Sequence, residues 1–499
     1  MPAFSLEPEQ TAWCAELRRL AAERLRPVAE KGEPGRVDRP LLAELGRLGL
    51  LARLFDSGAL ELCLMRESLA QVCTEAETAL ALQGLGAHPV HTHGTPAQHA
   101  RWLPGVMNGT LVAAFALSEP GAGSDAAALS LLAEPEEGTR GRGPGAGPSG
   151  LRCAEPAGGP GDGRGAGAGG PGDGPSDGRS GEPGHGPAAE AGGGPGGGGA
   201  GPTDGDGGPA DGRGGEPGGA PDGGRAVAPV GGSADGPGWG PAHEGVESGR
   251  GRSGGPGGLR RWRLTGEKCW ISNAPEADFY TVFARTTPGA GARGVTAFLV
   301  PADRPGLTGR ALEMLSPHPI GSLDFDGVPV TQDDVLGEVD RGFAVAMGTL
   351  NLFRPSVGAF AVGMAQAALD ATLEHTGRRE AFGGPLSDLQ AVSHQVAEMA
   401  LRTEAARLMV YAAATACDQG APGVPGRAAM AKLLATETAQ YVVDTAVQLH
   451  GARALRRGHL LEHLYREVRA PRIYEGASDV QRGIIAKELY ARQRERETR

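Results

Sequence analysis

The run from Arg472 to Arg482 places a carboxylate, Glu475, between an aromatic residue, Tyr474, and a glycine, Gly476. A carboxylate on a turn can act as a general base when burial raises its pKa and a substrate brings an acidic C–H within reach. By itself the pattern is more typical of a helix end, where a glycine often follows the last helical residue. The run is therefore a candidate catalytic site only if the rest of the chain builds a binding site for a carboxylate base.

A second candidate is the loop at residues 118–125, which follows an apolar run of strand length at residues 111–117. Its two glycines and its proline exclude a regular element and leave backbone N–H groups exposed. Such a loop can hold a phosphate or the polar edge of a cofactor. The pattern alone has little specificity, so its meaning depends on the surrounding elements.

A third pattern, His459-Leu460-Leu461-Glu462-His463, matches H-x-x-E-H, a zinc-peptidase motif with both histidines on one face of a helix. No motif downstream offers a further carboxylate ligand. We therefore expect these residues to be structural, and we predict no metal site.

The elements that must position these residues begin with an all-α region. Apolar residues recur at spacings of three and four from Trp13 to Leu25, which predicts an amphipathic helix over residues 6–30. Ala- and Leu-rich stretches predict more helices, and we take residues 1–110 as an N-terminal α domain. The further helical stretches are residues 41–50, 58–86 and 96–102.

The middle of the chain changes to strand-like patterns rich in aromatic and β-branched residues. We expect a small β-barrel or sandwich over residues 111–340. Its strands are predicted at residues 262–271, 279–285, 294–300 and 323–330, after the apolar run at 111–117.

A tract at about residues 134–258 interrupts this β domain. It contains more than half of the 85 glycines of the chain and hardly any large apolar residue. Such a composition cannot bury enough apolar surface to offset the entropy of ordering. We expect a disordered insertion in a surface hairpin.

Residues 341–499 are predicted to form a C-terminal four-helix bundle. The clearest seam is a run of mostly apolar residues alternating at spacings of three and four from Leu389 to Val410. Further helices are expected at residues 428–449, 460–468 and 480–493. The fold class is thus α+β, with helical, β and helical domains in that order.

Charge and cysteine usage limit the functional classes. The formal net charge of −11 disfavours broad binding to nucleic acids or anionic membranes. We expect no membrane span and no secretory signal, because no apolar run reaches the length of a span and charges occur throughout the first 25 residues. The six scattered cysteines fit a reducing compartment, so a cytoplasmic location is expected.

Five motifs occur in the order and context of the acyl-CoA dehydrogenase family, which the chain resembles over nearly its whole length outside the tract at about 134–258. The resemblance implies an FAD-dependent homodimer or homotetramer, in which a neighbouring subunit contributes part of the FAD site. The motifs are Ser118-Glu119-Pro120-Gly121-Ala122-Gly123-Ser124-Asp125, Thr265-Gly266-Glu267-Lys268-Cys269-Trp270-Ile271-Ser272-Asn273, Arg379-Glu380-Ala381-Phe382-Gly383, Gln448-Leu449-His450-Gly451 and Ile473-Tyr474-Glu475-Gly476.

The resemblance also assigns expected roles position by position. Substrate contacts are expected from Ser124 near the CoA part and from Asn351, Arg354 and Gly476. Cofactor contacts are expected at the isoalloxazine from Phe115, Leu117, Ser118, Trp270, Ile271 and Ser272, at the adenosine and diphosphate end from Arg379, Phe382, Gln390, Gln448, Leu449 and Gly451, and beside the base from Ala477 and Asp479.

Glu475 lies where most family members carry their catalytic base. The implied reaction removes the α-proton of an acyl-CoA thioester and passes a β-hydride to flavin N5, with the electrons leaving to an electron-transfer flavoprotein. A thioester α-proton is too weakly acidic for water to remove quickly, so a positioned carboxylate is needed. A minority of the family places the base at a position matching about Phe353, whose side chain cannot take a proton.

The chain departs from the family pattern in several places. The usual glycine-rich turn is absent at residues 50–55, and residues 316–321 are shorter than usual and lack a common arginine. Ala452, Ala477 and Asp479 replace a common glycine, threonine and glutamine. These changes leave open a relative that acts on a carrier-protein thioester or as an oxidase, and also a non-catalytic scaffold.

Overall fold

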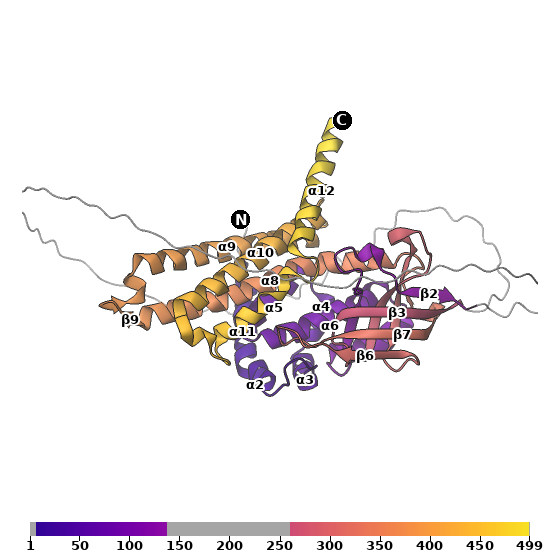
Figure 1. Cartoon of the computed structure of the whole chain (residues 1–499), viewed down its shortest axis with the longest axis horizontal. Coiled ribbons are helices and arrows are strands. Elements are labelled where there is room, and N and C mark those ends of the chain that lie inside the picture. The colour runs from indigo at the N-terminus through magenta and orange to yellow at the C-terminus, as the bar shows by residue number, and fades with distance from the viewer. Residues whose placement is uncertain (1–5, 137–259, 499) are drawn as a thin grey trace, which may run out of the picture. The chain divides into compact units, whose positions relative to one another are not determined.

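The structure is a computed structural model that describes residues 6–136 and 260–498. Helices, a sheet and then helices follow one another along the chain (Figure 1), which confirms the predicted fold class. The predicted disordered insertion lies outside the described residues, except for its first positions. Residue 134 falls within strand β2 (Leu132–Pro135), which pairs with β3 and β4 and buries Ala133. The predicted domain boundaries at residues 110 and 340 stay predictions.

The first predicted helix is α1 (Pro8–Leu20), which continues through a π-helical turn (Ala21–Leu25) into α2 (Arg26–Ala29). The region expected to be helical over residues 58–86 consists of two helices that meet at residues 71–73. A helix at residues 50–56 was not predicted, because the preceding helix was expected to end in a turn at Gly49, although Leu50, Leu51, Leu54 and Phe55 recur at helical spacing and are buried. The remaining N-terminal helices are α3 (Arg39–Arg47), α4 (Leu50–Asp56), α5 (Ala59–Ala70), α6 (Thr74–His93) and α7 (Pro96–Met107).

Helix α7 corrects one expected boundary, since it was predicted to end before Pro104. A proline inside a helix removes one backbone hydrogen bond. Leu103 and Val106 on either side are buried in the core, and their burial outweighs that loss.

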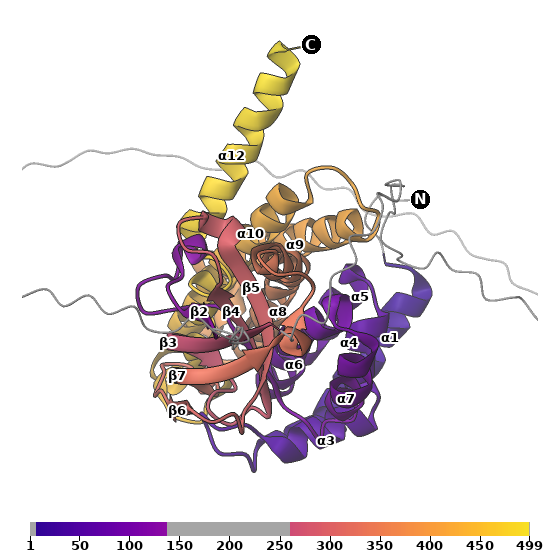
Figure 2. The same cartoon turned by 90° about the vertical axis from the view of Figure 1, so that its right-hand side faces the viewer.

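The middle region forms one eight-stranded sheet with strand order β6-β7-β3-β2-β4-β5-β8 and β1 paired in parallel with β4. Figure 2 shows β3, β7 and β6 side by side. Strand β6 was not predicted, because its residues are mostly exposed and show no apolar alternation. The strands are β1 (Ala113–Ala116), β2 (Leu132–Pro135), β3 (Arg261–Ser272), β4 (Phe279–Arg285), β5 (Val295–Pro301), β6 (Leu307–Ala311), β7 (Ile320–Thr331) and β8 (Val335–Leu336).

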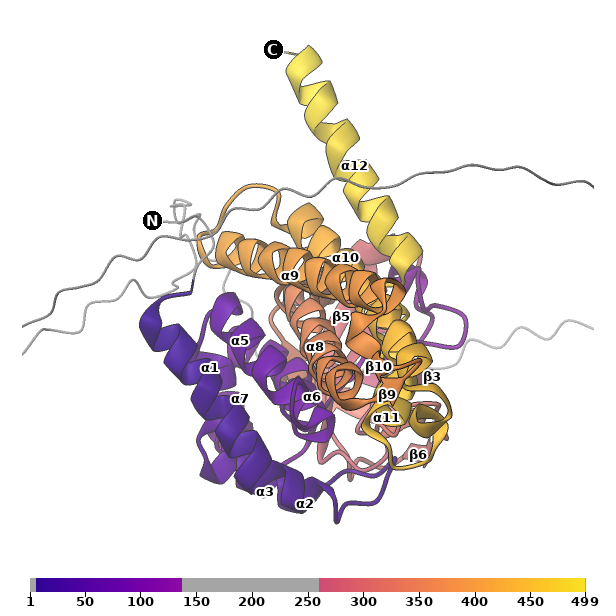
Figure 3. The ribbon, with the colours of Figure 1, turned by 90° about the vertical axis from the view of Figure 1, so that its left-hand side faces the viewer.

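Three long helices, α8, α9 and α10, run side by side in the C-terminal region, and α5 packs against α8 (Figure 3). The predicted seam from Leu389 to Val410 lies on α9, where Val392, Met399 and Ala406 are buried. The elements are α8 (Gly342–Arg378), a hairpin of β9 (Glu380–Ala381) and β10 (Gly384–Pro385), α9 (Gln390–Asp418), α10 (Val424–His450), α11 (Leu460–Glu467) and α12 (Ser478–Glu497).

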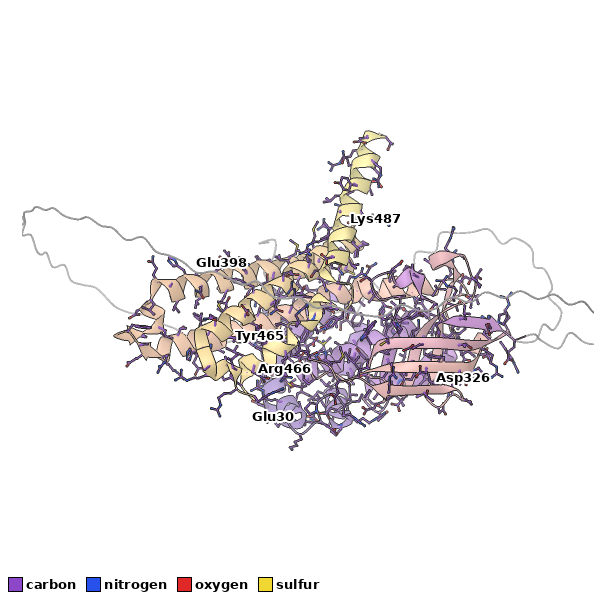
Figure 4. The ribbon with its side chains drawn as sticks, viewed as in Figure 1. Glu30, Asp326, Glu398, Tyr465, Arg466 and Lys487 are labelled. Atoms are coloured by element: carbon purple, nitrogen blue, oxygen red, sulfur yellow. The ribbon has the colours of Figure 1, made fainter. Side chains whose placement is uncertain are left out.

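Helix α8 is long and apolar enough to cross a membrane by length and composition, yet 78% of its most apolar window is buried inside the protein. That burial is typical of a core helix. Its residues join a core shared by α5, α9 and α10, while a second core lies between the N-terminal helices and the sheet. Charged residues such as Asp326 in β7 and Lys487 in α12 are exposed (Figure 4).

Candidate active site

The turn that carries Glu475 lies between a 3-10 turn (Ala470–Arg472) and α12. Glu475 has φ 51° and Gly476 has φ 95°, so both residues adopt the left-handed region. A Cβ at position 476 would lie 2.3 Å from Nε2 of Gln481, which excludes any residue larger than glycine without a shift of that buried side chain. Gly476 is therefore required by both backbone conformation and space.

Side chains from three helices hold the carbonyls of this turn. Gln481 Nε2 donates to Glu475 O at 3.2 Å and to Gly476 O at 2.9 Å. Lys432 Nζ on α10 donates to Gly476 O at 2.7 Å, and Arg354 Nε on α8 donates to Glu475 O at 3.4 Å. A residue with positive φ persists only when its surroundings determine it, and these bonds fix the conformation of the turn.

The Glu475 carboxylate itself is unsatisfied. Its Oε2 is buried and has no hydrogen-bond partner among the described residues. Burial raises the pKa of Glu475, and the nearby cations Arg66, Lys432 and Arg354 oppose that rise only in part. A buried acceptor without a partner is costly, so native proteins keep such groups mainly for a task. This carboxylate has the environment of a general base.

A buried ion pair lies near Glu475. Arg66 on α5 pairs with Glu77 on α6, and Arg66 Nη1 donates to Ser356 Oγ on α8 at 2.7 Å. Burial raises the pKa of Glu77 against the effect of Arg66. Arg66, Glu77 and Lys432 were not predicted as site residues. All three are buried, and Lys432 had the clearest signal in the sequence, because it is a single charge among Ala and Leu.

The expected substrate residues Asn351 and Arg354 lie together on α8, where Arg354 Nη1 donates to Asn351 Oδ1 at 3.1 Å. Arg354 also contacts the Glu475 carbonyl, so the structure brings these two expected residues to the base. Ser124 lies in the 118–125 loop and is exposed.

On the sheet side, the expected flavin residues meet where β1 ends beside a bulge in β3. The Cys269 N–H donates to Ser118 O at 3.0 Å, and the register of β3 shifts between Lys268 and Ile271. Trp270 within this bulge has φ 57° and its side chain is 48% exposed. A large, exposed aromatic ring offers a surface on which a flat ligand can stack.

The other expected flavin residues differ in orientation. Leu117 and Ile271 are buried, so their side chains face the core and only their backbone is available to a cofactor. Ser272 is half-buried. Phe115 is half-buried and packs on Phe283 at a ring distance of 4.9 Å.

The residues expected at the adenosine end gather at a different place. Gln448 lies near the end of α10, about 24 Å along the helix from Lys432 at 1.5 Å per residue, and Gly451 follows the last residue of α10. The structure therefore does not bring them to Glu475 within one chain. Around this end lie Arg379 at the end of α8, Phe382 with 90% exposure in the β9–β10 hairpin, Gln390 at the start of α9, and Leu449.

Ala477 and Asp479, the two flavin contacts expected after Glu475, offer little to a ligand. Ala477 is the residue before α12, and Asp479 is exposed and pairs with Arg482 at 2.8 Å.

The histidines of the H-x-x-E-H pattern have structural partners. His459 accepts from Leu461 N, and His463 bonds Thr74 Oγ1 at 2.6 Å. Within residues 6–136 and 260–498 no cluster of His, Cys, Asp or Glu could hold a metal ion.

A cavity of about 260 Å³ lies between α3, α6, residues 317–319 and α11. Its wall includes His318 and Glu467, which pair at 2.5 Å, and Glu475 is not among its lining residues. The cavity is thus separate from the base, and no motif in the sequence indicated it.

Comparison with known families decides the assignment. The N-terminal, middle and C-terminal domains of acyl-CoA dehydrogenase match residues 7–110, 245–328 and 340–490. The chain belongs to the acyl-CoA dehydrogenase family. The three matches cover most of the chain in the family's own order, which confirms the resemblance inferred from the five motifs.

Relatives of this acyl-CoA dehydrogenase family member include the probable acyl-CoA dehydrogenase FadE25 of Mycobacterium tuberculosis, 39% identical over 46% of this chain and 59% of the relative. The human mitochondrial short-chain specific acyl-CoA dehydrogenase is 40% identical over 46% of this chain and 56% of the relative. The chain thus spans less than two thirds of the length of these relatives.

Solved structures share the fold. Butyryl-CoA dehydrogenase from Megasphaera elsdenii gives a TM-score of 0.69 at 24% identity, covering 98% of this chain and 99% of that one. The FAD complex of PigA gives 0.69 at 22% identity, covering 98% and 99%. These similarities establish the architecture of this family member.

Proposed function

We propose that this chain is an FAD-dependent acyl-CoA dehydrogenase in which Glu475 removes the α-proton of an acyl thioester. The observation that carries the proposal is the buried, unpartnered Oε2 of Glu475 on a turn fixed by side chains from three helices. Such a group is preorganised to receive a proton from a bound substrate.

The residues present fit FAD. The exposed Trp270 ring, the backbone at Ser118 and the exposed 118–125 loop would hold the isoalloxazine side. Because Arg379, Phe382 and Gln448 lie far along the bundle from Glu475, they would hold the adenosine end of the FAD of a second subunit. FAD, when bound, supplies the acceptor for the hydride.

The chain's own residues perform the proton transfer. Burial raises the pKa of Glu475, so the ionised carboxylate is a stronger base than a solvated one. Asn351 and Arg354, in the first half of α8, would orient the thioester. The backbone N–H of Glu475 would donate to the thioester carbonyl, where negative charge develops.

We further propose a homodimer or homotetramer in the cytoplasm that passes its electrons to an electron-transfer flavoprotein. Relatives that are named acyl-CoA dehydrogenases support the reaction class on which this proposal rests. A carrier-protein thioester, an oxidase reaction and a scaffold without catalysis are the outcomes against which the proposal is tested.

The test is anaerobic reduction of the flavin. We expect the purified protein to be yellow and its flavin absorbance to bleach on adding butyryl-CoA. Glu475→Gln should retain FAD, and its rate of flavin reduction should fall by at least about 10²-fold, because general acid–base catalysis contributes roughly 10²–10⁴-fold. A protein with no flavin, or one that no acyl-CoA bleaches, would contradict the proposal. A normal rate in Glu475→Gln would show that another residue is the base.

A further inference from the structure

Helix α10 anchors the turn of Glu475 at two points. Lys432 Nζ donates to Gly476 O at 2.7 Å. Five residues further along, Glu437 accepts from Ser478 Oγ at 2.6 Å and pairs with Arg472 at 2.8 Å. The residues that these anchors hold, Arg472, Gly476 and Ser478, flank Glu475 in the sequence.

The Lys432 anchor is unusual because its side chain is fully buried while its hydrogen-bond acceptor is a neutral carbonyl. Burying an ammonium is costly unless an opposite charge is near. Burial lowers the pKa of Lys432 to about 8, and the Glu475 carboxylate opposes that decrease. A neutral side chain could hold the carbonyl at lower cost, so the charge points to an electrostatic role toward Glu475.

The charged groups that face this pair come from several elements. Toward Lys432 they are Glu475 on the turn, Arg354 on α8 and Glu437 on α10. Toward Glu475 they are Arg66 on α5, Lys432 on α10 and Arg354 on α8. Arg66 is paired with Glu77, and Arg354 is bonded to Asn351 and, at 3.4 Å, to the Glu475 carbonyl. Lys432 makes the shorter bond to the turn, at 2.7 Å to Gly476 O.

We propose that Lys432 is a positioning residue for Glu475: its buried ammonium fixes the Gly476 carbonyl and supplies a positive charge that favours the ionised carboxylate. The catalytic part of this inference rests on the proposed function. The structural part, an anchored turn, does not.

Three variants separate the two parts. Lys432→Met removes both the bond and the charge. Lys432→Gln leaves a neutral donor, and Lys432→Arg keeps the charge. Thr436→Val is the matched control, because Thr436 is buried one helical turn further along and its hydroxyl bonds the Lys432 and Leu433 carbonyls of α10, not the turn.

Two measurements are made on the FAD-loaded protein. Stopped-flow flavin reduction by butyryl-CoA is followed from pH 5.5 to 9, and amide hydrogen exchange of residues 473–481 is followed by mass spectrometry. For Lys432→Met we expect exchange about tenfold faster and a decrease of about tenfold or more in the reduction rate at pH 6. The acidic limb of the plot of reduction rate against pH should move to higher pH, because the cation that favoured ionised Glu475 is lost.

Lys432→Arg should restore the acidic limb. Lys432→Gln should move that limb even if it restores protection of the turn. An unchanged limb together with unchanged exchange in Lys432→Met, or a limb equally displaced in Thr436→Val, would overturn the proposal. If Lys432→Met does not fold, Lys432→Gln against Lys432→Arg decides. If no acyl-CoA reduces the wild type, the proposed function fails, and hydrogen exchange alone decides whether Lys432 anchors the turn.

Discussion

Lys268 and Glu119 form a buried ion pair of 2.7 Å that ties the end of β1 to the bulge in β3. Lys268 Nζ also donates to Leu117 O at 3.0 Å, and Glu119 accepts from the N–H groups of Ser130 and Leu131. Burial lowers the pKa of Lys268 to about 8. Burial acts to raise the pKa of Glu119, but the Lys268 charge and the hydrogen bonds hold it below its usual value.

The first prediction concerns this pair. Lys268→Met should destabilise the fold by about 3–5 kcal/mol, because it leaves the Glu119 carboxylate buried without its counter-charge. FAD affinity should decrease as well, since Ser118 and Trp270 lose their common support. Urea denaturation and FAD titration measure the two effects. The double variant Lys268→Met with Glu119→Gln is the control and should recover part of the stability. Equal stability of the single variant and the wild type would contradict the role of the pair.

Pattern and chemistry predict much of this molecule, and the exceptions have physical causes. The order of helices, strands and helices followed from apolar spacing. The predicted seam from Leu389 to Val410 was confirmed, because a helix that buries only one face repeats its apolar residues with the helical period. Strand β6 was missed because an exposed edge strand carries no alternation. Helix α8 is buried on nearly all sides, so no face is marked in its sequence.

Some residues of the candidate site could also be predicted from the sequence, and others could not. Glu475, Arg354 and Trp270 came from motifs, and the structure brings Glu475 and Arg354 into contact. Lys432 and Arg66 were missed, because a charged residue in a mostly apolar helix does not reveal its partner. Their partners are Gly476 and Glu77, which are distant in sequence and meet only in the folded chain.

A second prediction follows from the cost of burying Glu475. Its pKa in the folded protein is raised above the unfolded value, so the folded state binds the proton more tightly and stability falls as pH rises through that range. Glu475→Gln should therefore stabilise the apoprotein at pH 7, by about 1 kcal/mol. The gain should shrink toward pH 4, where the wild-type carboxyl is also neutral.

Thermal melts of both proteins at pH 7 and pH 4 test this, with Glu495→Gln on α12 as the control for an exposed helical carboxylate. A loss of stability in Glu475→Gln at pH 7 would mean that the charge of Glu475 stabilises the fold rather than straining it.

A third prediction concerns the cavity beside α11. Burial acts to lower the pKa of His318, but the adjacent Glu467 outweighs it and the pKa is raised. The stability from this pair is fully present below the unfolded pKa of histidine and is lost as pH rises through the folded pKa. His318→Gln should therefore lower the melting temperature more at pH 6 than at pH 9. The same loss at both pH values would show that packing, not charge, holds His318 against Glu467.

The last prediction separates the flavin contact of Trp270 from its part in folding. Its ring is 48% exposed and its φ of 57° is strained for a residue with a side chain. Trp270→Gly removes the ring and relieves the backbone, so the apoprotein should keep its stability to within about 1 kcal/mol. FAD should bind at least about tenfold more weakly, because stacked aromatic contacts contribute roughly 0.5–1.5 kcal/mol beyond area burial. Trp270→Phe should bind FAD nearly normally. Apoprotein melts and fluorescence titration with FAD measure these quantities, and a Trp270→Gly variant with unchanged FAD affinity would exclude the ring from the cofactor site.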